Sequence, residues 1–194
     1  MSNPRLRLVG LDWRFSDEVR QILSENNIEL IEGLVEEAGL GSARFDVVLM
    51  NQLIEHLWDP KLVMSKVFSS LKPGGLLSVE TVNSLGYDRA WFGNRYWGGY
   101  YWPRHLQIFS HESLARFLQG IGFSIERHVN LVAPLHWTYT LHAMTKDNPR
   151  LPRWVSGFFS DVNPLCLGFF TAIDVGAKLL GKTTTNQKMI ARKP

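Results

Sequence analysis

The stretch FDVVLMNQLIEHLWDPKLVMSKVFSSLKPGGLLSVETV, residues 45–82, decides the fold. It begins with Phe45–Met50, a nearly continuous apolar run rich in β-branched residues, which predicts a strand buried on both faces, as in a parallel sheet. Asp59-Pro60 predicts the start of a helix with proline at its first position. The turn signal Lys72–Gly75 ends this helix, and Leu76–Val82 predicts a second strand. The stretch is therefore one strand–helix–strand unit.

The same alternation continues on both sides of this unit. Ser16 and Ser110 are the predicted N-caps of two more helices. Four further short runs predict strands: Arg5–Asp12, Ile28–Glu32, Phe123–Val129 and Lys188–Ala191. Because strands that alternate with helices need crossover connections, the sequence predicts a single α/β domain over residues 1–194, with a doubly wound, mostly parallel sheet.

A long aromatic loop, residues 84–109, interrupts this alternation. Eight aromatic residues fall within the 16 positions from Tyr87 to Trp102, interleaved with glycines. A loop of this length inside a compact domain is usually functional. We interpret it either as a lid over a flat or sugar-like acceptor, with Trp91, Trp97 and Tyr101 as substrate contacts, or as a dimer contact.

An apolar insertion, residues 134–182, precedes the last predicted strand, and its prolines divide it into two or three expected helices. Leu165, Phe169, Ile173 and Leu180 are expected on one side of these helices. Two interpretations stay open. In the favoured one the insertion covers the sheet, and in the other it makes peripheral contact with a membrane, as an amphipathic helix does.

Composition limits the class of protein. The 194 residues are 45% apolar and 20% charged, which allows a buried core and excludes wholesale disorder. The single cysteine, Cys166, allows no intrachain disulfide and predicts a reducing, cytoplasmic setting. The longest uncharged stretch of the insertion, residues 162–173, has 12 residues, whereas a bilayer span needs about 20.

Charge is distributed unevenly along the chain. Residues 1–90 hold 9 basic and 13 acidic residues, whereas residues 91–194 hold 12 basic and 5 acidic residues. The basic half suits an anionic ligand, a phosphorylated substrate or an acidic membrane surface, and it is equally compatible with a solvated basic face. Because the basic residues are scattered, we expect no nucleic-acid partner. The oligomeric state stays open.

Several motifs, taken together and in this order, resemble the class I S-adenosylmethionine-dependent methyltransferases. They are VGLD (Val9–Asp12), FDVV (Phe45–Val48), LIEHLWDP (Leu53–Pro60), LKPGGLL (Leu71–Leu77), PRHL (Pro103–Leu106), Phe109-Ser110 and Gly122-Phe123. The first four are similar to the family's second strand, its fourth strand with the following segment, and the turn into its fifth strand. The last three resemble a branch that modifies small molecules, often sugars, quinones or lipids.

The resemblance implies a Rossmann-like sheet and S-adenosylmethionine as the cofactor. It assigns Asp12 to the ribose hydroxyls, through charge-assisted hydrogen bonds. Trp13 and Val35 would sandwich the adenine, and Leu34 stands where many relatives carry an acidic residue near the adenine. Asn51 would contact the amino-acid moiety of the cofactor or the substrate, beyond the carboxyl end of its strand. The alternative roles are a solvated residue at a strand end for Asp12, core packing for Trp13 and Val35, and loop hydrogen bonding for Asn51.

The chain departs from the family at its start, because it has no first strand followed by a GxGxG turn, the element that lets the backbone approach the cofactor closely. In the family that strand is central. Its two neighbours must then pair directly or leave backbone groups unpaired, at a cost of about 1–3 kcal/mol for each group. We expect a sheet that is incomplete at the N-terminus, explained by truncation, by a rearranged sheet or by a partner chain, of which truncation is favoured.

The resemblance also implies an activity: methyl transfer to an oxygen, rather than to nitrogen or carbon, of a small or lipid-linked acceptor. His105 is the candidate base for the hydroxyl proton, and Arg104 would orient an anionic substrate. His56 is a weaker candidate, because a histidine just before a helix commonly bonds local backbone. We expect no metal site, since the sequence has no HxxxH pair. The alternative function is that of a non-catalytic remnant or interaction protein that has lost cofactor binding, which the missing glycine turn favours.

Overall fold

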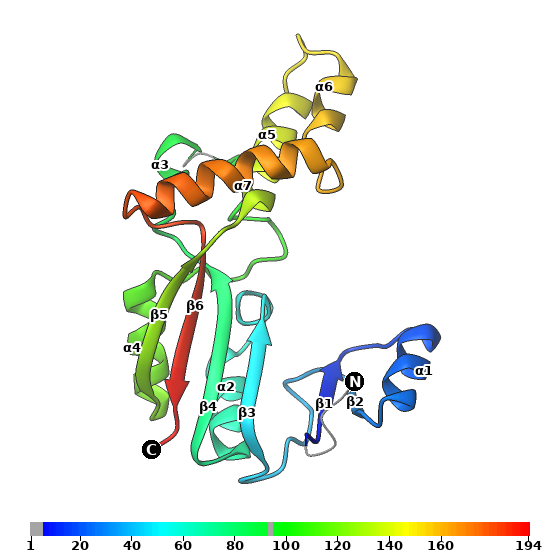
Figure 1. Ribbon diagram of the computed structural model, residues 1–194, viewed down its shortest axis with the longest axis vertical. Coiled ribbons are helices and arrows are strands. Elements are labelled where there is room, and N and C mark those ends of the chain that lie inside the picture. Colours follow the sequence, from blue (N-terminus) through cyan, green and yellow to red (C-terminus); the bar gives the residue numbers. More distant parts are fainter. Residues whose placement is uncertain (1–5, 93–94) are drawn as a thin grey trace.

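The computed structural model describes residues 6–92 and 95–194 (Figure 1). Strands and helices alternate along most of this length. In chain order the elements are β1 (Val9–Asp12), α1 (Asp17–Glu25), β2 (Glu29–Glu32), β3 (Phe45–Asn51), the 3₁₀-helix η1 (Ile54–His56), α2 (Pro60–Ser70), β4 (Leu71–Val82), α3 (Arg89–Phe92), α4 (His111–Ile121), β5 (Ser124–Leu131), α5 (Pro134–Lys146), α6 (Arg153–Phe158), α7 (Pro164–Leu179) and β6 (Asn186–Arg192). The predicted strands and capped helices are confirmed, with shifts at their ends. The strand predicted over Arg5–Asp12 begins at Val9, and Arg5 lies outside the described residues.

Local signals place the helix ends. The side chains of Ser16 and Asp59 accept hydrogen bonds from the first turns of α1 and α2, and Ser110 belongs to a capping box at α4. Gly122 ends α4 at a φ of 120°, a backbone conformation that residues other than glycine rarely adopt. These caps satisfy backbone groups that the helices leave unpaired, and they determine where each helix begins or ends.

The main sheet has four strands in the order β3-β4-β6-β5. β3 and β4 are parallel, and Asn51 lies opposite Glu80 near their carboxyl ends. β6 runs antiparallel to both β4 and β5, so that β3, β4 and β5 share one direction. The α/β, Rossmann-like class is confirmed. The pairing is more mixed than the predicted mostly parallel sheet, because the last strand enters between β4 and β5 in the opposite direction.

The main core lies between this sheet and two helices, α2 and α4, which pack side by side (Figure 1). Alternate residues of β4 face this core, as the period of a strand requires. Fully buried members of the cluster are Val63, Met64, Leu77, Val79, Leu114, Leu118 and Ala191. This layer is the rigid support on which the loops at the strand ends are built.

The motif LKPGGLL differs from its prediction. The sequence predicts a turn at Lys72–Gly75, whereas β4 already begins at Leu71 and includes these residues. The register jumps from the pair Phe45–Leu71 to the pair Val47–Leu76, so the proline and glycine residues form an irregularity within the strand. Gly74 accommodates it with a φ of 76°.

The N-terminal strands form a separate two-stranded sheet in which β1 and β2 are parallel. Among the described residues, β1 does not pair with β3, and a groove of about 280 Å³ separates the two strands. Val47 and Leu49 line it on β3, where they are 53% and 70% exposed, and Val9 and Leu11 line it on β1. The expected incomplete sheet therefore takes the form of two sheets, which Figure 1 shows apart from each other. The facing edges of β1 and β3 line a common apolar groove.

The insertion has three helices, α5, α6 and α7, and they pack against one another beyond the strand ends (Figure 1). The expectation that it covers the sheet is wrong, because its apolar cluster includes Tyr87 and Phe92 of the aromatic loop instead. Leu165 and Phe169 lie one turn apart on α7, as the prediction of a shared side requires, and they are 77% and 63% exposed. The buried residues of α7 are Cys166, Phe170 and Asp174. No helix in the described part of the chain is long and apolar enough to cross a membrane.

Candidate functional site

Two predicted cofactor contacts stand at the carboxyl ends of parallel strands. Asp12 is the last residue of β1 and Asn51 is the last residue of β3, and both strands point the same way (Figure 1). Both side chains are exposed. The carboxylate of Asp12 accepts only a long contact from the backbone N–H of Arg14, 3.4 Å, among the described hydrogen bonds. This is the edge where α/β sheets bind ligands.

The residues expected around the adenine follow β1 and β2. Trp13 and Leu34 are largely exposed, whereas Val35 is buried and packs in the main core. The contacts of Asp12, Trp13 and Leu34 with the ribose and adenine therefore stay predictions, for which all three side chains are accessible. Because Val35 belongs to the core, only the edge of its side chain could contact the adenine. The glycine-rich turn with which the family binds another part of the cofactor has no counterpart in this sequence.

A second cavity, of about 380 Å³, opens between the aromatic loop, the end of β4 and the start of α5. Its polar wall comes from the residues that follow β3 and from the PRHL motif. The polar and aromatic side chains that line the cavity include Gln52, His56, Glu80, Tyr101, His105 and Tyr139. The structure thus brings the candidate base His105 and the predicted substrate contact Tyr101 together with His56, whereas Arg104, Trp91 and Trp97 do not line this cavity.

The PRHL segment is fastened to η1 by backbone contacts. The N–H of Leu106 donates to the carbonyl oxygen of Glu55 across 2.8 Å. The amide of Gln107 donates to the carbonyl oxygens of Ile54 and Leu57, at 3.0 and 2.8 Å. These contacts satisfy the end of the 3₁₀-helix and hold two segments that lie about fifty positions apart in the sequence.

The two imidazoles of the cavity lie against each other, with ring centroids 4.9 Å apart. Nδ1 of His56 lies 2.9 Å from the carbonyl oxygen of Arg104, and Nδ1 of His105 lies 2.9 Å from that of Gly99. Because a carbonyl oxygen only accepts, each Nδ1 carries the proton, and Nε2 keeps its lone pair in the neutral ring. Burial lowers the pKa of His105, which favours this neutral form.

Aromatic rings complete the cavity wall. Tyr101 stacks on Tyr139 of α5, with centroids 5.4 Å apart and ring planes 16° from parallel. The guanidinium of Arg104 lies over the Tyr101 ring and donates to its hydroxyl at 3.1 Å. Arg104 is exposed and supports the tyrosine from outside. Sequence analysis did not find Tyr139, because it belongs to the insertion and only the tertiary fold brings it beside the loop.

Trp97 and Trp91 are placed away from the cavity wall. Trp97 is 1% exposed, and its Nε1 donates to Asp88 at 2.9 Å. The other oxygen of Asp88 accepts from the hydroxyl of Thr185. Trp91 lies against Trp137 of the insertion, with centroids 5.9 Å apart. Both placements favour a structural role, holding the loop to the segment just before β6 and to the insertion, over substrate contact.

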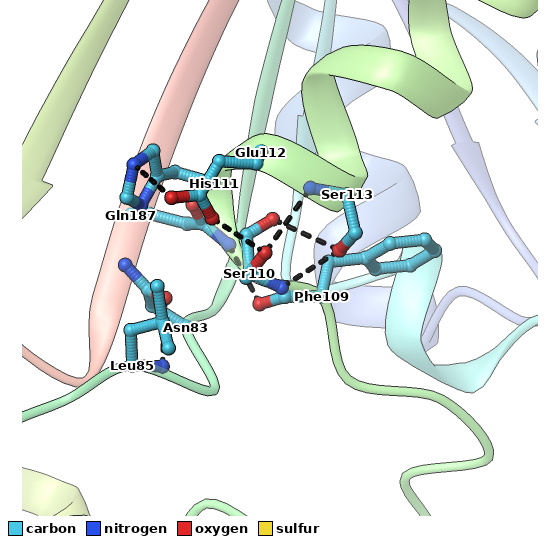
Figure 2. A network of polar contacts seen from close by, with 8 residues as sticks. All are labelled: Asn83, Leu85, Phe109, Ser110, His111, Glu112, Ser113 and Gln187. Atoms are coloured by element: carbon cyan, nitrogen blue, oxygen red, sulfur yellow. Dashed lines mark hydrogen bonds and ion pairs between the residues drawn. The ribbon is translucent and has the colours of Figure 1, made fainter.

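The far end of the aromatic loop is fixed by a second polar network (Figure 2). The amide of Gln187, in β6, donates to the carbonyl oxygens of Val82 and Phe109, at 3.2 and 3.1 Å. The capping box of Ser110 and Ser113 then starts α4 directly after Phe109. With both ends anchored, the loop presents PRHL to the cavity from a supported position.

Buried polar side chains of the insertion hold the cavity together from the other side. The carboxylate of Asp174 accepts from the Tyr87 hydroxyl at 3.0 Å, from Nε1 of Trp137 at 2.9 Å and from the N–H of Ala133 at 2.7 Å. His136 is buried in the cavity wall, and desolvation lowers its pKa to about 4. Sequence analysis missed both, although one acidic residue within the apolar run of α7 is a signal for a buried, partnered carboxylate.

Comparison with known proteins agrees with this geometry. The profile of the family described as "Methyltransferase domain" matches residues 5–128. A probable S-adenosylmethionine-dependent methyltransferase from Mycolicibacterium smegmatis is 30% identical over 122 residues, which are 62% of this chain and 44% of that protein. A ubiquinone biosynthesis O-methyltransferase from Histophilus somni is 22% identical over 126 residues, 65% of this chain and 47% of that protein. The chain thus spans less than half the length of these relatives.

A solved structure shows the same fold. The SAM-dependent methyltransferase of Thermotoga maritima, described as a possible histamine N-methyltransferase, superimposes with a TM-score of 0.58 at 15% identity. The match covers 96% of this chain and 73% of that protein. Because the family profile matches well over half of the chain, the protein belongs to the class I S-adenosylmethionine-dependent methyltransferase family.

Proposed function

We propose that this chain transfers the methyl group of S-adenosylmethionine to an oxygen atom of a small or lipid-linked acceptor. One observation carries the proposal: the cavity beyond β3 and β4 is lined by two imidazoles whose Nε2 lone pairs are left free by backbone hydrogen bonds of Nδ1. A neutral imidazole at that place can take a hydroxyl proton. The O-methyltransferase named among the relatives supports oxygen as the methylated atom.

The chemistry that these residues would perform is an in-line displacement. The acceptor oxygen forms a bond to the methyl carbon while the carbon–sulfur bond breaks, and S-adenosylhomocysteine leaves. The hydroxyl proton moves to Nε2 of His105. Asp12 would hold the ribose and Asn51 the methionine end or the acceptor, so that the reaction depends mainly on positioning. The stacked pair Tyr101–Tyr139 offers a flat wall for an aromatic acceptor ring.

Exposed apolar side chains support the lipid-linked class of acceptor. Leu165 and Phe169, one turn apart on α7, share a face that points away from the core. Exposed cations at Arg153 and Lys178 flank this region of the chain. Apolar side chains among basic ones suit the interface of an anionic bilayer, where a lipid-linked acceptor would be found.

A second candidate function, an interaction protein without cofactor binding, is favoured by the facing edges of β1 and β3, which pair with no other strand in the described part of the chain. An enzyme assay separates the two. The protein is incubated with S-adenosylmethionine labelled in the methyl group and with dihydroxyphenyl acceptors that carry or lack an isoprenoid tail. We expect labelled product, and a rate reduced about 10²–10⁴-fold by His105→Gln, as for loss of a general base.

The matched control is His142→Gln. That imidazole lies in α5 and also bonds a backbone carbonyl through Nδ1, to Ser156 at 2.8 Å, but it does not line the cavity. Its activity is expected to equal that of the unmodified chain. Transfer that is equally fast in His105→Gln would contradict the assignment of the base. The absence of transfer to every acceptor, together with no cofactor binding, would favour the interaction protein.

A further inference from the structure

A carboxylate and two imidazoles converge at the back of the cavity. One potential ligand atom from each of Glu55, His56 and His105 lies within 4.8 Å of those from the other two. Glu55 and His56 belong to η1, and His105 belongs to the PRHL segment fastened beside it. The cluster therefore rests on two segments that backbone hydrogen bonds hold together.

Glu55 carries an unpartnered oxygen in this cluster. Its side chain is 0% exposed, and Oε2 accepts from the Thr81 hydroxyl at 2.8 Å. Oε1 is buried and has no hydrogen-bond partner among the described residues. A buried carboxylate with a free oxygen is costly unless a proton or a cation neutralises it. Burial raises the pKa of Glu55, because desolvation disfavours the charged carboxylate.

The two imidazoles are oriented as metal ligands are. In metal sites the nitrogen that does not bind the ion almost always donates to a carbonyl or carboxylate oxygen, which fixes the tautomer and the ring plane. Nδ1 of His56 and Nδ1 of His105 each meet this condition, with carbonyl oxygens at 2.9 Å. Both rings also line the open cavity, so that an ion bound to them would keep a free position toward it.

We propose that Oε1 of Glu55, Nε2 of His56 and Nε2 of His105 bind one divalent cation of the Zn²⁺ class, with a remaining coordination position open to the cavity. Nitrogen ligands together with one carboxylate suit such ions better than Mg²⁺ or Ca²⁺. Ligand atoms around tetrahedral Zn²⁺ lie about 3.3 Å apart, and one potential ligand atom of each of the three residues lies within 4.8 Å of those of the other two.

The site departs from the sequence-based expectation of no metal, because its ligands come from two distant motifs without metal-ligand spacing. The consequence for catalysis rests on the proposed function. An acceptor hydroxyl bound at the open position would lose its proton to solvent, and its oxygen would then attack the methyl group. In the metal-loaded protein His105 would therefore be a ligand, and in the metal-free protein it would be the base.

The test is metal binding to the tag-free chain without cofactor or acceptor. After treatment with a chelator, the protein is titrated with ZnCl₂ by calorimetry and with CoCl₂ by visible absorption, where a four-coordinate site gives d–d bands. We expect one ion per chain and an affinity at least tenfold lower in His56→Gln and in His105→Gln. His142→Gln is the matched control and is expected to bind as the unmodified chain does.

Two results would overturn the inference: no stoichiometric binding, or binding that the two histidine variants leave unchanged. Glu55→Gln tests the third ligand, with circular dichroism to verify its fold, and we expect weaker Co²⁺ binding in a folded variant. Failure of the proposed function is distinguishable. Zinc binding without methyl transfer would contradict only the proposed activity, whereas transfer that is insensitive to chelators, in a chain that binds no zinc, would contradict only the metal site.

Discussion

The hydroxyl of Tyr87 donates a hydrogen bond to Oδ1 of Asp174 across 3.0 Å. Tyr87 begins the aromatic loop, and Asp174 lies near the middle of α7, 87 positions further along the chain. The same carboxylate also accepts from Trp137 and from the backbone of Ala133. A single buried acid therefore joins the loop, the start of the insertion and its longest helix, and the cavity wall depends on it.

Asp174→Ala is expected to lower the free energy of unfolding by about 3 kcal/mol. The substitution leaves three donors without their acceptor, two of them buried, and each unsatisfied buried donor costs about 1–3 kcal/mol. Urea denaturation followed by tryptophan fluorescence measures the change. The control is Asp161→Ala, which removes an exposed acid from the same insertion and is expected to change stability by less than about 0.5 kcal/mol. Equal effects of the two substitutions would show that the buried network does not stabilise the fold.

The buried imidazole of His136 predicts a pH dependence of stability. Its pKa in the folded protein is lowered to about 4 by desolvation, whereas the unfolded chain has a value of about 6.5. Between pH 6.5 and about 4, His136 is therefore protonated in the unfolded chain but stays neutral in the folded protein. This contribution to stability is complete above pH 6.5 and falls as the pH is lowered, by about 3 kcal/mol at pH 4.

The measurement compares the unfolding free energy of the unmodified chain and of His136→Gln between pH 8 and pH 4. Carboxylates and other histidines titrate in both proteins, so the difference between the two curves isolates His136. We expect the difference to shrink or reverse as the pH falls from about 6.5 to 4. Two parallel curves would contradict a neutral, buried His136.

The exposed face of α7 predicts binding to anionic vesicles. The double variant Leu165→Ser and Phe169→Ser removes two exposed apolar side chains and is expected to lose most sedimentation with phosphatidylglycerol vesicles. Binding of the unmodified chain should also weaken at high salt, because screening reduces the attraction of basic residues to the bilayer. Trp58→Ser is the control, since Trp58 is strongly exposed but lies just before α2. Failure of the unmodified chain to sediment with the vesicles would contradict the prediction that α7 binds anionic membranes.

The strands, the capped helices and their order could be predicted, because period, cap and turn signals are local. Ser16, Asp59 and Gly122 act where the sequence places them. The motif LKPGGLL was misjudged, since a turn signal and a bulge within a strand use the same residues. The incomplete sheet was also expected, and among the described residues β1 and β3 lie in separate sheets with a groove between them.

The candidate site could be predicted only in part. The position of Asp12 and Asn51 at the ends of β1 and β3 could be predicted, because the strand signals are local, whereas their contact with the cofactor stays a prediction. Trp97 was predicted to contact a substrate because it lies among aromatic residues, yet its ring is buried and bonded to Asp88. No local pattern reveals this acceptor. The pairing of Glu55 with His105, and of Tyr101 with Tyr139, depends on contacts between distant segments that no local pattern encodes.

Calorimetric titration with S-adenosylhomocysteine tests the central claim, that this chain binds the nucleoside of the methyl donor at Asp12. We predict micromolar affinity for the unmodified chain and at least tenfold weaker binding by Asp12→Ala, equivalent to about 1.4 kcal/mol or more. Asp46→Asn, which removes an exposed acid of β3 paired with Lys72, is expected to bind normally. The account would be contradicted by no heat of binding from the unmodified chain at millimolar ligand, or by equal affinities of the Asp12→Ala and unmodified proteins.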